Sequence, residues 1–351
     1  MLERVEPLPH PPLACLSRLC IFPLVLMNSP SIIGHSRQCA ELMDDLTKNS
    51  LSHAYLFAGK KHLGKFTVAR WFAESILSAG KADEEKKNIQ LLCEKNMHPD
   101  LLTLDKLWID DVCTDWHFIA KSSSAPQQHR AKKKVKTDTI GFDDVCALQE
   151  RLYGTPQGSH MICLIRSIER LHITAANALL KIIEEPPPHV LLVFTTESLG
   201  AVPKTIISRM RTLHFFPVPE TDLEPLVART PTEDRTLLLD IAGGAPGIIL
   251  RCLNDAEQLR KQRQAHIDAH HFYESTSPVA RYRHMRDAWK NEEDASLFFH
   301  QLLLHVSAEM RGNKTRATKA VACAQKLFSL LRTLETNTQR ELLAAHTSLS
   351  L

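Results

Sequence analysis

The sequence predicts an α/β core built on a parallel sheet, followed by two all-helical domains. Three short apolar runs of strand length lie far apart in the chain, at residues 54–58, 161–165 and 190–196. The segments between them contain helical periodicity, and strands joined by helices form parallel sheets with helices on both faces. After residue 219 no strand pattern recurs. A chain of 351 residues is also longer than one hydrophobic core usually accommodates, so several domains are expected.

The first βα unit begins at residue 52. Its apolar run, 54–58, is followed by a loop from Gly59 to Gly64 and then by an amphipathic run that reaches Leu77. The second run, 161–165, precedes a helix expected from about Thr174 to Glu185, which three consecutive prolines terminate. The third run, 190–196, is apolar throughout, as expected of a strand that is covered on both faces.

These patterns predict four segments. Residues 1–28 form a leader that is disordered or begins at a misassigned start, with Met27 a plausible true start. The apolar stretch within it contains Arg18 and Pro23 and is too short to span a membrane. The α/β domain covers 29–218, a small helical domain covers 219–255 and a third, all-helical domain covers 256–351. Two short helical patterns are expected between Asp222 and Asp255, separated by a glycine-rich break.

A surface insertion is predicted at about residues 116–137, where periodicity fails and Ser, Pro, Gln and Lys dominate. It ends in a basic run, and two interpretations stay open for that run: a solvated loop, or a contact with DNA or a partner. The basic residues are Arg130, Lys132, Lys133, Lys134 and Lys136.

The composition excludes a disordered chain, because 44% of residues are hydrophobic and 24% are charged. It is also unlike that of a strongly basic nucleic-acid-binding protein, because the net charge is only +3. The nine cysteines are scattered singly without a Cys-x-x-Cys pair. This pattern predicts reduced thiols in the cytoplasm, with neither disulfides nor a zinc site.

The loop from Gly59 to Lys65 matches a phosphate-binding loop up to its lysine, with glycines that allow backbone N–H groups to approach phosphates. The next position should be Ser or Thr to hold magnesium, but it is Phe66. Thr67 follows one residue later, which on a helix turns its hydroxyl about 100° away. Two interpretations stay open: the loop binds ATP weakly, or it is a degenerate loop that preserves the fold and binds no nucleotide.

A working ATPase also needs a carboxylate at the end of a neighbouring strand to hold magnesium, and usually a second acid to activate water. After the run 161–165 the candidate positions are Arg166, Ser167 and Ile168, none of which is acidic. Glu169 comes later and is expected to face elsewhere as an ordinary surface acid. Since two independent requirements fail together, the sequence predicts no autonomous hydrolysis and no metal site.

Four segments then form a recognisable pattern. They are His-Ala-Tyr-Leu-Phe at 53–57, His-Pro-Asp-Leu at 98–101, Thr-Ala-Ala-Asn-Ala-Leu-Leu-Lys-Ile-Ile-Glu-Glu-Pro-Pro at 174–187, and Lys-Thr-Ile-Ile-Ser-Arg at 204–209. The chain resembles the delta-prime family of bacterial clamp-loader subunits, which are AAA+ proteins, and gamma/tau subunits are the nearest relatives of that family. The similarity runs from about 33 to 247 and is strongest over 175–209. The four-cysteine zinc module of many members is absent, since only Cys93 stands in that segment.

The resemblance implies that the chain is a subunit of the DNA polymerase III holoenzyme and that this subunit has no catalytic activity by itself. It would join gamma/tau-like motor and delta-like subunits through its third, collar domain, and meet the sliding clamp and primed DNA through the complex. It also implies that Ser208 and Arg209 form the element that supplies an arginine finger to the ATP of a neighbouring subunit. Two other hypotheses remain: a weakly active gamma/tau-like motor that uses Lys65, Thr67 and Glu169, and a DNA-binding module that uses residues 130–136.

Overall fold

The computed structural model describes residues 32–104, 140–288, 292–312, 321, 323–327 and 347. The predicted leader and basic run lie outside the described residues. The predicted insertion at 116–137 lies outside them as well.

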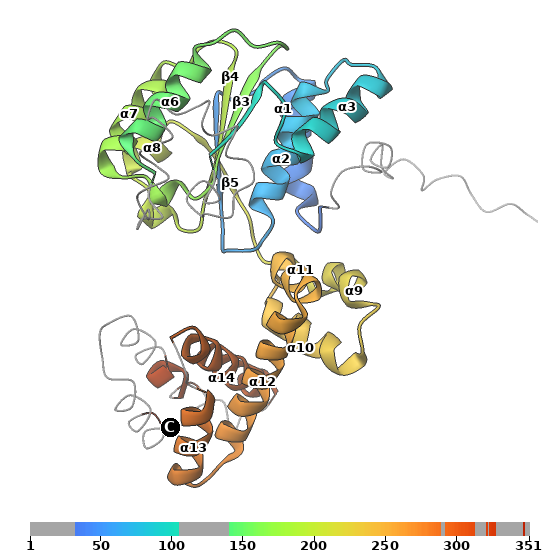
Figure 1. Ribbon diagram of the computed structural model, residues 1–351, viewed down its shortest axis with the longest axis vertical. Helices are drawn as coiled ribbons and strands as arrows, with labels where there is room; N and C mark the ends of the chain where they lie inside the picture. Colours follow the sequence, from blue (N-terminus) through green and yellow to red (C-terminus); the bar gives the residue numbers. More distant parts are fainter. Residues whose placement is uncertain are drawn as a thin grey trace, which may run out of the picture.

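A five-stranded, all-parallel sheet forms the core of the larger part of the chain (Figure 1). Its order is β2-β3-β4-β1-β5, so the predicted α/β fold class is confirmed. The sequence located β1, β3 and β4 correctly, but β2 and β5 were not expected because four residues carry little periodic signal. The strands are β1 (Ala54–Ala58), β2 (Leu101–Leu104), β3 (Met161–Ile165), β4 (Val190–Thr196) and β5 (Arg211–His214).

Helices cover both faces of this sheet (Figure 1). Successive strand residues point to opposite faces, so Tyr55 and Phe57 pack against α2 while Leu56 packs with the cluster that contains α6 and α7. One face carries α1 (Ser36–Thr47), α2 (Lys65–Leu77) and α3 (Asp83–Glu94). The other carries α6 (Phe142–Leu152), α7 (Ile173–Glu184) and α8 (Lys204–Ile207).

The strand order fixes where a ligand could bind. β1 and β4 are neighbours, yet β1 leads into α2 on one face and β4 leads into α8 on the other. Ligands of open α/β sheets bind where the connections of adjacent strands diverge in this way, outside the carboxyl ends of the strands. The loop that follows β1 therefore lies at the position where a nucleotide would be expected.

Two groups of helices follow the sheet (Figure 1). The first is α9 (Glu220–Val227), α10 (Thr232–Ala242) and α11 (Pro246–Asn254), which pack around buried Leu223, Leu238 and Ile249. The segment expected to hold two helices thus holds three, since α9 is only eight residues long and contains Pro225. The second group is α12 (Ala256–Glu274), α13 (Pro278–Ala288) and α14 (Glu292–Gly312), around buried Phe272, Phe298 and Phe299.

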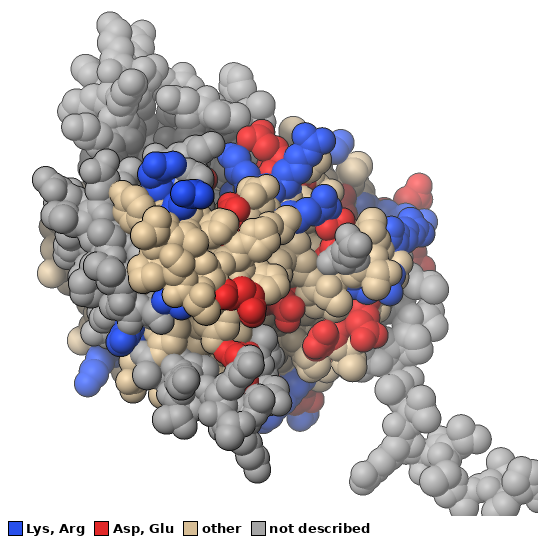
Figure 2. Space-filling model, turned by 90° about the horizontal axis from the view of Figure 1, so that it is seen from below, with Lys and Arg blue, Asp and Glu red and all other residues tan. Residues whose placement is uncertain are grey.

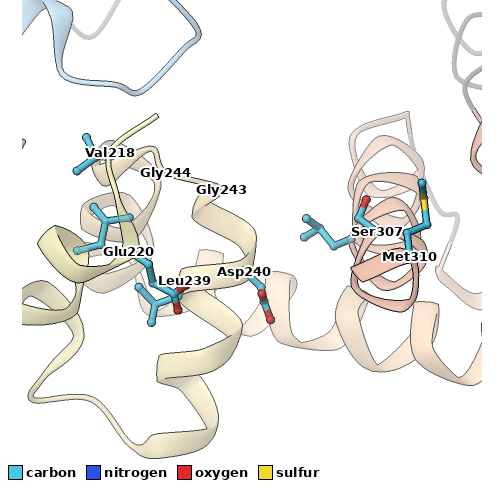
Figure 3. A pocket seen from close by; sticks show the side chains of 10 residues that line it. Val218, Glu220, Leu239, Asp240, Gly243, Gly244, Ser307 and Met310 are labelled. Atoms are coloured by element: carbon cyan, nitrogen blue, oxygen red, sulfur yellow. The ribbon is translucent and has the colours of Figure 1, made fainter. Parts of the chain in front are cut away.

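An open cavity of about 550 Å³ lies where α10 faces α14 (Figure 3). Its lining includes Asp240 from α10 and Ser307 from α14, and none of its lining residues comes from the loop after β1. On the face of the molecule in Figure 2, acidic and basic side chains both occur around a region that carries neither, so the described part of this face is not a continuous basic surface. No helix within the described ranges is long and apolar enough to cross a membrane.

Candidate functional site

The loop after β1 is shaped by two glycines. Gly64 precedes α2 with a φ of 92°, a left-handed conformation that favours glycine. At Gly59 a β-carbon would lie 2.4 Å from the backbone oxygen of Phe215, so the close approach of the segment after β5 also requires glycine. The glycine at 59 is therefore explained by packing alone and gives no independent sign of a bound phosphate.

Lys65 occupies the inside of its own loop. Its Nζ donates to the carbonyl oxygens of Gly59, at 2.5 Å, and Lys60, at 2.6 Å, and the residue is only 7% exposed. Burial lowers the pKa of Lys65 to about 8, although the nearby carboxylates of Glu197 and Glu169 act in the opposite direction. The lysine that the sequence predicts for phosphate binding thus has two backbone oxygens of its own loop as partners.

The two positions that should hold magnesium contact each other. The guanidinium carbon of Arg166, just after β3, lies 5.5 Å from the centre of the Phe66 ring at the start of α2, which is a cation–π distance. A ring has no metal-binding oxygen and a guanidinium repels a cation. Thr67 is half-buried in the next position of α2. The side chains of Phe66 and Arg166 therefore do not fit a magnesium ion.

The prediction that Glu169 faces elsewhere is wrong. Ser167 takes a left-handed conformation, with φ 58°, and its N–H donates to the Thr195 hydroxyl at 3.0 Å. This turn brings the Glu169 carboxylate back over the end of β4, where it accepts a hydrogen bond of 3.3 Å from the Glu197 N–H. There its negative charge opposes the lowering of the Lys65 pKa by burial. Glu169 thus belongs to the loop region.

The first helical group touches the loop. The N–H of Gly247, at the start of α11, donates to the His62 carbonyl at 2.9 Å. Arg251, one turn along α11, is exposed, and together with burial its charge lowers the pKa of His62. Arg251 therefore lies near the loop. The contact through Gly247 was missed by sequence reasoning, since only the tertiary fold brings α11 to the loop.

Ser208 and Arg209 lie in the short turn between α8 and β5, and both are exposed. Arg209 Nη1 donates to the Thr205 carbonyl at 2.8 Å and approaches the Ser208 hydroxyl at 3.4 Å. Its Nη2 forms an ion pair of 2.9 Å with Oε1 of Glu184, the last residue of α7. The sequence did not single out Glu184, because its distance from Arg209 along the chain hides the contact.

Arg209 and the loop lie at opposite ends of the strands. In the parallel pairing of β1 with β5, Arg211 is level with Tyr55, four residues before Gly59. At about 3.3 Å per residue, this offset is ~13 Å, and Arg209 precedes Arg211 by two further residues. The structure therefore does not bring the predicted finger together with the predicted loop of the same chain.

Within the described part of the chain, no group of three or more His, Cys, Asp or Glu side chains is arranged to hold a metal ion. Cys93 is fully buried on α3, and burial raises the pKa of its thiol to about 12. A protonated thiol in an apolar environment is a poor metal ligand.

Comparison with known proteins gives two kinds of match. Residues 34–219 match the family model described as DNA polymerase III, delta subunit. DNA polymerase III subunit delta' of Bacillus subtilis is 32% identical over 201 residues, which are 54% of this chain and 52% of that protein. DNA polymerase III subunit gamma/tau of Mycobacterium tuberculosis is 26% identical over 235 residues, which are 64% of this chain and 36% of that protein. The matches thus span about half the length of these relatives or less.

Among solved structures, a gamma subunit-related protein of DNA polymerase III from Thermotoga maritima aligns with a TM-score of 0.53 at 16% identity. The alignment covers 88% of this chain and 97% of that one. At this identity the likeness supports the fold alone.

Proposed function

Because the chain belongs to the DNA polymerase III delta-subunit family, we propose that it is a delta-prime-like subunit of a clamp loader that does not itself hydrolyse ATP. In this proposal it is a stator in the cytoplasm, in a ring with gamma/tau-like motor subunits and a delta-like subunit. The ring opens a sliding clamp and places it on primed DNA, and this chain supplies Arg209 to the ATP of a neighbouring motor.

The contact between Phe66 and Arg166 carries the non-hydrolysing part of the proposal. Hydrolysis requires a metal ion that bridges the phosphates and an acid or polar group that orients water. Here an aromatic ring and a guanidinium stand at the metal-binding positions and pack on each other. Lys65 remains in the loop, so the missing metal ligands remove hydrolysis without removing the lysine that would contact a phosphate.

The position of Arg209 supports the role in trans. Arg209 precedes β5, at the amino ends of the strands, whereas the loop of the same chain follows β1 at their carboxyl ends. A planar, permanently charged guanidinium stabilises the charge that develops on a transferred phosphoryl group. An exposed arginine that lies far from its own loop is therefore suited to a phosphate of a neighbouring subunit.

The test uses the complex reconstituted with its cognate motor and delta-like subunits. We expect Arg209→Ala to lower ATP turnover on the order of a thousandfold, as arginine fingers do. Arg229→Ala, at an exposed arginine between α9 and α10, is the matched control. Unchanged turnover by the Arg209 variant would refute the trans role.

One observation favours the alternative, a weakly active motor subunit. The Glu169 carboxylate lies close enough to influence Lys65, so an acid is present near the loop after all. In that case the isolated chain would hydrolyse ATP in a magnesium-dependent manner, and Lys65→Ala would abolish the activity. Titration of labelled ATP with and without magnesium would show whether the loop binds nucleotide at all.

A further inference from the structure

We propose that Glu184 is the positioning residue for Arg209, and that its carboxylate orients the guanidinium toward the phosphate of the neighbouring subunit. This inference rests on the proposed trans role of Arg209. It adds a second chain segment to the finger, since Glu184 ends α7 while Arg209 follows α8.

Three acceptors restrain the guanidinium. Glu184 Oε1 lies 2.9 Å from Nη2, and the Thr205 carbonyl lies 2.8 Å from Nη1. The Ser208 hydroxyl approaches Nη1 at 3.4 Å and itself donates to the Thr205 carbonyl at 3.1 Å. Contacts on both terminal nitrogens fix the plane of the group. Only Glu184 contributes from outside the turn, and it brings the only negative charge of the three.

The backbone at Arg209 is already fixed, so the side chain is what needs restraint. The N–H of Arg209 donates to the Ile206 carbonyl at 3.2 Å, and the following Met210 is buried in the core. The Arg209 side chain is 40% exposed. A long exposed arginine samples many rotamers, and ordering it at the moment of reaction costs conformational entropy. An acceptor that holds the useful rotamer in advance removes part of that cost.

The end of α7 holds Glu184 in place. Ile182 and Ile183 of the last turn are buried, and the prolines from residue 186 to 188 prevent the helix from continuing. The carboxyl end of a helix carries partial negative charge, which adds to the attraction for a guanidinium. Glu185 is exposed, and within the described residues no ion pair of its carboxylate occurs. The two adjacent glutamates are thus distinct in what they contact.

The ion pair orients Arg209 without sequestering it. The Arg209 and Glu184 side chains are 40% and 47% exposed, so a phosphate can approach the guanidinium while the ion pair stays in place. A guanidinium carries five N–H donors, and the three contacts above leave at least two for a phosphate. Glu184 therefore acts through Arg209 and need not touch the nucleotide.

The test is a double-mutant cycle in the reconstituted complex, with kcat and KM for ATP measured separately. We expect Glu184→Ala to lower kcat on the order of tenfold, since one long side chain must then be ordered during the reaction. Glu184→Gln keeps an acceptor oxygen and should retain kcat within about threefold. Glu185→Ala removes the same charge one residue later and should leave kcat unchanged. In an Arg209→Ala background, Glu184→Ala should have no additional effect.

Three results would overturn the inference. Glu184→Ala could match the Glu185→Ala control, it could raise turnover because the ion pair competes with phosphate, or its effect could persist without Arg209. If Glu184→Ala fails to assemble, Glu184→Lys decides the question, because its cation should repel Arg209 and lower kcat further. A complex in which Arg209→Ala itself changes nothing would instead refute the trans role, so the two failures are distinguishable.

Discussion

The guanidinium of Arg166 lies over the ring of Phe66, with its central carbon 5.5 Å from the ring centre. Arg166 follows β3 and Phe66 opens α2, so they occupy the two places from which an acid and a hydroxyl would hold magnesium. The residues that stand in place of the two magnesium ligands thus pack directly on each other. Restoring one ligand alone would leave the other obstacle in place.

We therefore expect the double variant Phe66→Thr, Arg166→Asp to gain magnesium-dependent ATP binding. Magnesium should tighten ATP binding about tenfold or more in this variant, since a hydroxyl and a carboxylate are the oxygen ligands that the ion requires. Calorimetric titration with and without magnesium measures the effect. Phe66→Thr alone is the control and should respond weakly. A double variant that is insensitive to magnesium would contradict the view that these two positions caused the loss.

Arg209→Lys should strongly reduce turnover of the complex, though less than Arg209→Ala does. Lysine keeps the charge but lacks the planar fork that contacts Glu184, the Thr205 carbonyl and a phosphate at once. We expect a fall on the order of a hundredfold in kcat, measured by steady-state ATP hydrolysis. Wild-type rates for the lysine variant would show that charge alone suffices.

Arg211→Ala should destabilise the chain by about 2–3 kcal/mol. Asp45 is buried and accepts from the Arg211 guanidinium and, at 3.0 Å, from the Tyr55 hydroxyl. Removal of the arginine leaves a buried carboxylate without its cation. Urea unfolding measures the loss, and Lys48→Ala, which breaks an exposed pair with Asp44, should cost under about 0.5 kcal/mol. Equal effects of the two variants would contradict the assignment.

Glu74 should make stability depend on pH. Burial raises its pKa from 4.5 to about 7, and the folded state therefore holds the proton more tightly than the unfolded state. Stability should fall by about 2–3 kcal/mol as pH rises from about 4.5 to 7 and change little above that. Glu74→Gln should remove this slope and be more stable than the wild type at pH 8. Glu84→Gln, at an exposed position of α3, should keep the slope.

Gly59→Ala should destabilise the fold by about 2–3 kcal/mol even without nucleotide, because the new methyl group would meet the Phe215 backbone oxygen at 2.4 Å. Gly200→Ala is the control, since its nearest contact is an ordinary 3.6 Å to the Ser198 hydroxyl. Thermal unfolding compares them. If Gly59→Ala unfolds like the wild type, the glycine would need a ligand-based explanation.

The sequence predicted much of the sheet because three strands are continuously apolar and flanked by clear helix or turn signals. It missed β2 and β5, which are four residues long, and α9, which contains Pro225. The family predicted from the motifs at 174–187 and 204–209 is confirmed by the match over 34–219. The site residues at 59–67 and the pair Ser208 and Arg209 stay predictions, as do the domain boundaries and the partners.

The loss of magnesium ligands at Phe66 and Arg166 follows from the sequence by itself, because a side chain without a suitable oxygen cannot hold the ion in any fold. The folded arrangement of the chain is what packs these two residues together, turns Glu169 back toward Lys65, and pairs Arg209 with Glu184 at the other end of the strands. Strand order and register set these relationships through pairings distant in the chain, and local residue patterns do not specify them.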